Sequence, residues 1–259
     1  MDVFLQGFSV FLLVFCRITA FFVVSPIFAI REAPAQFKIG LGFFVSLIVF
    51  LASGFRFQAP TDATYLLYVI HEVLAGLLLG YLFYLFFTVA QISGAFVDMQ
   101  MGFGMANIID PMTGVSAPLT GNFKYYLLLA VFLAMNGHHY MLAALMDSYD
   151  WLPPFGELFA AIASGGLTEQ LVRSLATTFV LGFQLTAPLM VAMFLTDTGI
   201  GFLAKTAPQF NVFVIGLPIK IMVGLLMLMA SLAGFAAFCS YLMSVLFDHL
   251  RLLMAAITG

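Results

Sequence analysis

The sequence predicts an all-α protein of the membrane type, and three observations support that fold class. Hydrophobic residues make up 63% of the 259-residue chain and charged residues 8%, whereas a typical soluble domain is about 45–50% apolar and about 25% charged. The apolar residues are gathered in long runs that short polar breaks separate. No run alternates apolar and polar residues with a period of two, so transmembrane β-strands are not predicted.

The charge balance and the cysteine content exclude several classes of protein. Nine Lys and Arg against twelve Asp and Glu give a formal net charge of −3, and no basic tract is present to neutralise phosphates, so we expect no nucleic-acid partner. Cys16 and Cys239 lie in apolar runs near opposite ends of the chain, which argues against a disulfide framework and a structural zinc site. No basic segment or small-residue cleavage motif marks a signal peptide, so the first apolar run is expected to remain in the mature protein.

Six apolar runs are long enough to cross a bilayer, whose hydrocarbon core needs about 20 helical residues. Arg17 interrupts the first run, which stops at Ser25–Pro26, and Arg56 and Pro60 mark the break after the second. Membrane lipid is therefore an expected partner of the chain, as a multi-pass protein. The six runs are residues 3–25, 39–55, 65–97, 125–146, 171–196 and 219–254.

Two of the predicted helices are too long for simple spans. No proline occurs between Thr61 and Asp110, which predicts a helix of about 36 residues, or roughly 54 Å. The last helix, opened by Pro218 in its first turn and ending near Ile257, is expected to be similar. Both exceed the roughly 30 Å hydrocarbon core and are apolar nearly all round, so lipid or protein must cover them on every side. Because one copy of the chain could scarcely do so, we expect partner subunits.

The remaining segments are predicted to be connections. Residues 147–170 carry Pro153–Pro154 and Gly165–Gly166 as helix breakers, and Pro188 interrupts the fifth run. Residues 196–213 form a polar link, in which Asp197 and Lys205 place opposite charges on its two sides.

None of the enzyme motifs that we considered is complete. His71–Glu72 begins like the zinc-protease H-E-x-x-H, but Ala75 stands where the second ligand should be. His138 and His139 are neighbours, which point about 100° apart on a helix and do not chelate one metal together. No serine stands in a G-x-S-x-G motif, and no glycine-rich phosphate loop is present. We therefore predict no catalysis, no metal and no cofactor.

Two features inside the apolar runs predict close packing. Arg17 lies in the middle of the first run, where an arginine at the bilayer centre costs about 2.5–3.5 kcal/mol. Its charge must be compensated by a carboxylate, a cluster of carbonyls or water. Three roles are open for Arg17: an ion pair within the chain, an ion pair between subunits, or a place in a conducting path. Gly76 and Gly80 form a G-x-x-x-G motif, which allows two helix backbones to approach closely. Glu72, near the start of its helix, could equally complement the helix dipole.

Residues 98–124 are loop-like, and the stretch 99–123 is the most unusual part of the sequence. It contains four glycines, two prolines and four methionines. A loop this long is usually functional or disordered, and its apolar content argues against disorder. Since methionine adapts to varied apolar surfaces, the loop could line or block a pore. The alternative is a re-entrant connector that only packs.

Five groups of residues, in this order and spacing, resemble the FliR family of flagellar type III export-gate proteins, whose counterparts serve in virulence secretion. The resemblance covers essentially the whole chain. Family members commonly have a basic or polar residue where this chain has Phe210. The groups are Arg17 with Ser25-Pro26-Ile27-Phe28; Pro34 with Lys38-Ile39-Gly40; Gly102-Phe103 with Ile109-Asp110-Pro111; Asn136-Gly137-His138; and Ala207-Pro208-Gln209-Phe210-Asn211-Val212-Phe213 with Gly216-Leu217-Pro218-Ile219-Lys220.

The resemblance implies a non-enzymatic subunit of an export gate in the bacterial cytoplasmic membrane, at the flagellar basal body. Such subunits assemble with FliP-like and FliQ-like proteins into a helical cone, beside FlhB-like and FlhA-like proteins, and unfolded flagellar subunits pass through. The single domain, residues 1–259, would consist of a FliP-like part over about 1–190 and a FliQ-like part over about 191–259.

The resemblance also implies roles for individual residues. A loop at about 106–118 would plug the closed channel, and other residues would stabilise subunit contacts. The alternative function is a stand-alone secondary transporter, which needs broken helices around a midplane site; Pro188 offers one break, with no counterpart in an inverted half. The plug residues are Phe103, Met105, Asn107, Ile108, Ile109, Asp110, Pro111 and Met112. The interface or structural residues are Arg17, Gly76, Gly80, Asp197, Lys205, Pro208, Gln209, Asn211, Pro218 and Lys220.

Overall fold

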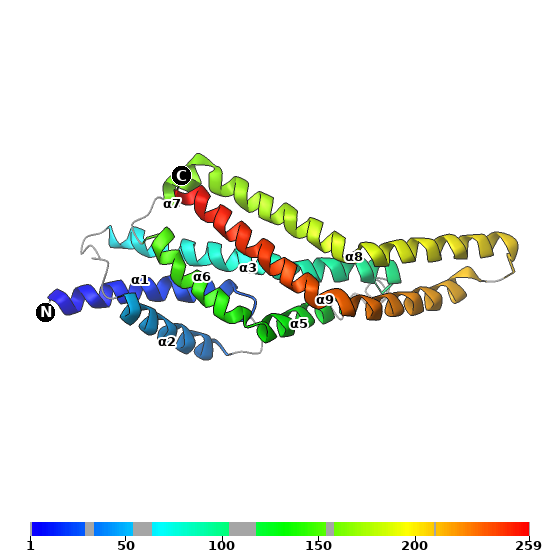
Figure 1. Cartoon of the computed structure of the whole chain (residues 1–259), viewed down its shortest axis with the longest axis horizontal. Coiled ribbons are helices and arrows are strands. Elements are labelled where there is room, and N and C mark those ends of the chain that lie inside the picture. The colour runs from blue at the N-terminus through cyan, green and yellow to red at the C-terminus, as the bar shows by residue number, and fades with distance from the viewer. Residues whose placement is uncertain are drawn as a thin grey trace. The chain divides into compact units, whose positions relative to one another are not determined.

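The regular structure of the chain is helical throughout the residues that the computed structural model describes, which are 2–28, 34–53, 64–103, 118–153, 158–209 and 211–258. No strand occurs in these ranges, which confirms the predicted all-α class. Figure 1 shows the helices in chain order. They are α1 (Asp2–Val24), α2 (Ala35–Ser53), α3 (Tyr65–Met101), α5 (Leu119–Ala134), α6 (Gly137–Trp151), α7 (Leu158–Ser164), α8 (Gly166–Thr206) and α9 (Val212–Thr258).

The predicted spans correspond to helices of the structure. Within the described ranges, α1, α2, α3, α8 and α9 are long and apolar enough to cross a membrane, and α5 with α6 makes up to a sixth span. The expected single run over 125–146 is instead two helices that meet at 76°. Asn136, between them, has a left-handed backbone with φ of 57°, a conformation that asparagine tolerates better than most residues. The chain therefore turns here within an otherwise apolar stretch.

The length of α3 confirms the predicted helix of about 36 residues, whereas α8 and α9 are longer than expected. α3 has 37 residues, α8 has 41 and α9 has 47, or roughly 55 to 70 Å of helix at 1.5 Å per residue. α3 stops at Met101 because Gly102 adopts a left-handed φ of 83°, and the Phe103 amide then donates to the Asp98 carbonyl at 2.9 Å. This glycine termination is common at helix ends.

Several expectations about helix boundaries were wrong. Residues 147–170, predicted to be a connection, contain the end of α6, all of α7 and the start of α8. The link predicted over 196–213 is mostly helix, since α8 continues to Thr206 and α9 begins at Val212. Pro218 therefore lies inside α9 rather than in its first turn. Pro188 likewise lies inside α8 without ending it.

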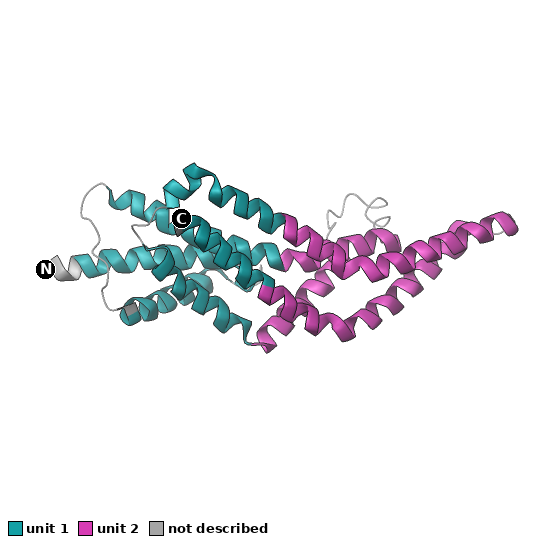
Figure 2. Cartoon of the chain, turned by 45° about the horizontal axis from the view of Figure 1, so that its top comes forward, with its two compact units in different colours: residues 1–86, 136–175, 245–259 teal, residues 87–135, 176–244 magenta. Residues whose placement is uncertain are grey.

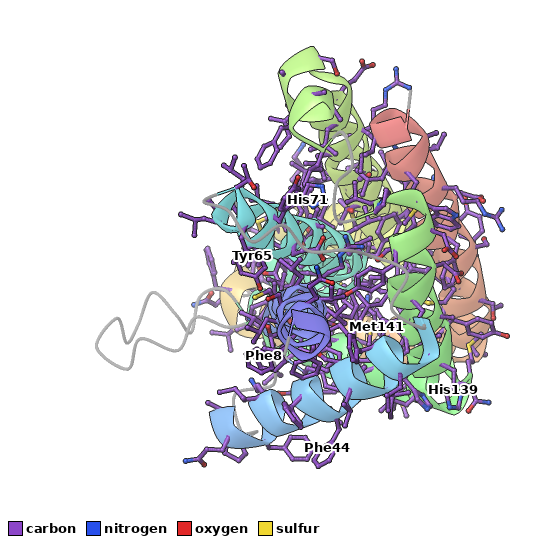
Figure 3. The ribbon with its side chains drawn as sticks, turned by 90° about the vertical axis from the view of Figure 1, so that its left-hand side faces the viewer. Phe8, Phe44, Tyr65, His71, His139 and Met141 are labelled. Carbon is purple, nitrogen blue, oxygen red and sulfur yellow. The ribbon has the colours of Figure 1, made fainter. Side chains whose placement is uncertain are left out.

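The chain divides into two compact units, coloured separately in Figure 2. Unit 1 comprises residues 1–86, 136–175 and 245–259, and unit 2 comprises residues 87–135 and 176–244. In unit 1, α1 packs between α2, α3 and α6, as Figure 3 shows in a view from the end of this unit. Met141 of α6 faces α1, where its sulfur lies 3.2 Å from the Ser25 hydroxyl, whereas Phe44 of α2 points outward and is 64% exposed.

The core of unit 2 is built where α3, α8 and α9 meet. Val97 and Met101 of α3 pack with Leu189 and Met193 of α8 and with Leu228 of α9. A Cβ at Gly224 of α9 would stand only 2.6 Å from side-chain atoms of Met101 and Met193. Here the flexible methionine side chains fill the space that a missing Cβ leaves.

Candidate functional site

The most completely bonded polar centre of unit 1 is formed around Arg17. Its guanidinium pairs with both carboxylate oxygens of Glu72, at 2.7 Å from Nε and 2.8 Å from Nη2. Nη1 donates to the carbonyl and the hydroxyl of Ser148, each at 3.1 Å, and Nη2 donates to the Leu152 carbonyl at 2.7 Å. The Tyr149 ring centre lies 4.1 Å from the guanidinium carbon. Arg17 and Glu72 are both fully buried.

This centre joins three helices, which explains how a charge can stand in the middle of α1. Arg17 comes from α1, Glu72 from α3 and Ser148 from the last turn of α6, and Leu152 follows directly after α6. The Ser148 carbonyl already accepts from the Leu152 amide at 2.8 Å, so the arginine gives it a second donor and also bonds the Leu152 carbonyl at the helix end, while the carboxylate neutralises the charge of the arginine. Of the alternatives open for Arg17, the structure shows an ion pair within the chain.

His71 lies beside this centre on α3 (Figure 3). Its Nδ1 is 3.3 Å from a Glu72 carboxylate oxygen, and its ring is 6.0 Å from that of Phe159. Its Nε2 has no hydrogen-bond partner among the described residues. These ranges also contain no group of three or more His, Cys, Asp or Glu that could hold a metal ion.

Gly76 and Gly80 lie one and two turns after Glu72, on the same face of α3. A Cβ at Gly76 would overlap the Arg17 carbonyl oxygen, and a Cβ at Gly80 would stand 2.9 Å from that of Phe21. The backbone of α1 therefore rests directly on the two glycines. Because this contact fixes the separation of α1 and α3, it also fixes how far the Arg17 side chain must reach to Glu72.

The residues predicted at the polar link lie around the ends of α8 and α9 in unit 2. Asp197 pairs with Lys220 at 2.8 Å. The sequence had indicated only that Asp197 and Lys205 carry opposite charges on the two sides of the link. Lys205 is exposed in the last turn of α8. Asn211 caps α9, since its side-chain oxygen accepts from the Phe213 amide at 3.1 Å. Pro208 and Gln209 form an exposed turn between the helices.

The predicted plug residues are mostly outside the part of the chain that the structure describes. Phe103 is described and packs, partly buried, against the Val97–Met101 cluster of unit 2. Met105, Asn107, Ile108, Ile109, Asp110, Pro111 and Met112 lie outside the described residues.

Sequence reasoning missed a second polar centre, at the crossing of α3 and α5 in unit 2. Asp98 of α3 accepts hydrogen bonds from the Thr120 amide of α5, at 3.1 and 3.2 Å, and from the Thr120 hydroxyl. Lys124 of α5, which is 4% exposed, donates to the Ser93 hydroxyl of α3 at 2.7 Å. The sequence placed residues 98–124 in a loop, because Gly94 and Gly121 are not in a G-x-x-x-G motif and do not by themselves indicate a helix contact.

Comparisons with known proteins identify the family. Residues 8–246 match the family model described as bacterial export proteins, family 1. The flagellar biosynthetic protein FliR of Bacillus subtilis (strain 168) is 37% identical over 250 residues, which are 96% of each chain. FliR of Escherichia coli (strain K12) is 28% identical over 235 residues, or 90% of this chain and 88% of the relative. The Yop proteins translocation protein T of Yersinia pestis is 27% identical over 241 residues, or 92% and 91%. The matches extend over nearly the whole of an all-α chain with several apolar helices, and the chain belongs to the FliR family of bacterial export proteins.

Proposed function

We propose that this chain is a non-enzymatic subunit of the flagellar type III protein export gate in the bacterial cytoplasmic membrane. The chain is a component of a type III export apparatus and a multi-pass membrane protein. The observation that carries the proposal is its family membership, because relatives over almost the full length are flagellar biosynthetic proteins and a Yop translocation protein.

The surface of unit 2 supports assembly with other subunits. Side chains on α8 and α9 that would be core residues in a soluble protein are open in the single chain, with Phe194 70%, Phe202 67% and Met229 68% exposed. Since α8 and α9 are far longer than the roughly 30 Å hydrocarbon core, lipid alone does not cover them along their whole length. Apolar surface of this extent marks contact with protein or membrane.

The partners that we propose are FliP-like and FliQ-like subunits in a helical cone, with FlhB-like and FlhA-like proteins beside it and unfolded flagellar subunits as the transported substrates. Within the chain, residues of about 1–190 form the FliP-like part and about 191–259 the FliQ-like part. The FliP-like and FliQ-like parts are defined by resemblance to the partner proteins. They do not correspond to the two compact units, each of which is made of segments that alternate along the chain.

Native mass spectrometry in mild detergent, after co-expression with the FliP-like and FliQ-like neighbours, tests the assembly. We expect one copy of this chain in a larger mixed complex. A lone monomer or homodimer that is stable without these neighbours would contradict the proposal and would favour a stand-alone secondary transporter, for which flux by the purified chain would be the confirming result.

We also propose that the segment at about 106–118 plugs the closed channel, with Phe103 at its base. Apolar side chains packed in a pore exclude water and ions, because a charge entering such a region loses its hydration. Deletion of 106–118 should leave the complex assembled but raise its conductance to small ions in liposomes. Replacement of 106–117 by a Gly/Ser stretch of equal length is the matched control for loop closure, and it should leak as well. Conductance at the wild-type level in both variants would contradict the plug.

A further inference from the structure

One face of α8 packs inside unit 2, and its contacts show which way the helix is turned. Thr186 is fully buried, and its hydroxyl donates to the Ser93 carbonyl of α3 at 3.1 Å and lies 2.8 Å from the Ser93 hydroxyl. A Cβ at Gly182, one turn earlier, would stand 2.9 Å from an α3 side chain. Successive residues of an α-helix are about 100° apart. Gln184 and Pro188, two positions before and after Thr186, are therefore on the opposite face.

This outward face of α8 is apolar apart from one side chain. Gln184 and Pro188 are both exposed. Around them, Val180 is 54%, Phe183 49% and Val191 60% exposed. An exposed apolar patch of this kind marks contact with protein or with lipid rather than with water.

Two hydrogen-bonding groups within this face favour a protein partner over lipid. Proline has no N–H, so the Gln184 carbonyl, four residues before Pro188, lacks the donor that closes a regular helical turn. The Gln184 side-chain amide also forms no hydrogen bond with any of the described residues. In hydrocarbon no water is present to satisfy such groups, and leaving them unpaired is strongly unfavourable. A polar side chain on a second helix can bond both groups across a helix contact.

We propose that the face of α8 around Gln184 and Pro188 binds a helix of a neighbouring export-gate subunit that presents an amide or a hydroxyl side chain at the level of Gln184. The proposal rests on the proposed function, since it takes gate subunits as the partners. An amide or a hydroxyl fits because it can donate to the Gln184 carbonyl and accept from the Gln184 amide. A charged side chain would meet no opposite charge, because residues 180–191 contain none.

Photo-crosslinking identifies what covers the face. Benzoylphenylalanine in place of Phe183 keeps the aromatic character of that position and leaves Gln184 intact. In the full chain, co-expressed with its FliP-like and FliQ-like neighbours, it should crosslink to one gate subunit. The absence of any crosslink to protein would indicate lipid or water on this face, and a crosslink to an exported protein would place the face in the transport path. Either result would overturn the proposal.

Substitution of Gln184 tests the hydrogen bond itself. Gln184→Met removes the amide at nearly constant length. It should lower recovery of the complex about three- to tenfold relative to the amount of the chain in the membrane, as expected for the loss of a hydrogen bond between helices. Native mass spectrometry should show that the missing subunit is the one to which position 183 crosslinks. The double variant Gln184→Met/Pro188→Ala, which also gives the carbonyl a donor within α8, should lower recovery no less.

Thr198→Val is the matched control. Thr198 is an exposed polar residue of the same helix, but its hydroxyl donates to the Phe194 carbonyl at 2.9 Å within α8 and so needs no partner. Its replacement should leave recovery at the wild-type level. Wild-type recovery in both Gln184 variants would overturn the proposed contact, and so would an equal loss in Thr198→Val.

The wild-type complex separates this contact from the proposed function. If the wild type assembles with the FliP-like and FliQ-like subunits while position 183 crosslinks to none of them, the function stands and the contact is overturned. If the wild type forms no complex with these subunits, the proposed function fails and the contact fails with it.

Discussion

At the scale of single residues, Arg17 shows how a charge is accommodated in an apolar helix bundle. Five N–H groups are available on a guanidinium. Their acceptors are the Glu72 carboxylate, the carbonyl and hydroxyl of Ser148, and the Leu152 carbonyl. A buried pair of this kind adds little stability over an apolar replacement, but removal of one partner is strongly destabilising.

Arg17→Ala should therefore lower both recovery and thermal stability of the complex, because it leaves the Glu72 carboxylate buried without its partner at a cost of about 3–5 kcal/mol. Arg17→Lys should give a recovery and a thermal stability between those of the wild type and Arg17→Ala, since lysine cannot make the bidentate contact with Glu72. The double variant Arg17→Met/Glu72→Met should restore much of the loss. Unchanged yield and thermal stability in Arg17→Ala would contradict this account.

The sequence predicted that Arg17 needs a partner but could not name it. Glu72 is 55 positions away along the chain, and no periodicity links two residues on different helices. For Asp98 and Lys124 the obstacle was different, because the glycines and prolines around them favoured a loop. The structure shows that Gly94 and Gly121 are used for a helix crossing, a distinction that glycine content alone does not make.

At the scale of helices, small residues set the distances on which the polar centres depend. Gly76 and Gly80 admit the backbone of α1 to α3 in unit 1, and Gly94 with Gly121 does the same for α3 and α5 in unit 2. Dispersion and hydrogen bonds, rather than the hydrophobic effect, hold helices together in lipid. Close backbone contact is therefore a large part of what specifies each pair.

Gly76→Ala should destabilise unit 1, because the added Cβ overlaps the Arg17 carbonyl oxygen and pushes α1 away from Glu72. The expected loss is about 1–3 kcal/mol, as for other overpacked sites. Gly40→Ala on α2 is the matched control, since a Cβ there meets nothing within 4 Å. Thermal unfolding of the purified complex measures both variants, and an equal effect in the two would refute the packing argument.

Helix boundaries were harder to predict than helix identity. The apolar runs gave the spans, but α8 continues through the threonines at 196 and 198, which resembled a polar link. Their hydroxyls donate to the carbonyls of Ala192 and Phe194 at 2.8 and 2.9 Å, so the polar groups are satisfied inside the helix. Composition in a short window does not show this local bonding.

At the scale of the whole molecule, a substitution at Lys205 tests the predicted contact with partner subunits. Lys205 is exposed in the last turn of α8, whereas the nearby Lys220 is engaged with Asp197 within unit 2. Lys205→Ala should lower recovery of the complex with the FliP-like and FliQ-like subunits, while its helix content stays unchanged. Arg173→Ala, at an exposed cation on the same helix, serves as the control. Recovery that is equal in the two variants would remove Lys205 from the interface.

The division into units has a consequence for how the chain is made. Unit 1 contains the first 86 residues and also residues 245–259, whose Leu250 and Leu253 are buried. Phe86 packs near His249 there, with ring centres 5.5 Å apart. During synthesis, α1 and α3 are available to each other early, but their unit acquires its segment of α9 only after residues 245–258 have left the ribosome. Until then the nascent chain exposes apolar surface that the membrane must cover, and loss of residues 245–259 would damage the part of the protein that was made first.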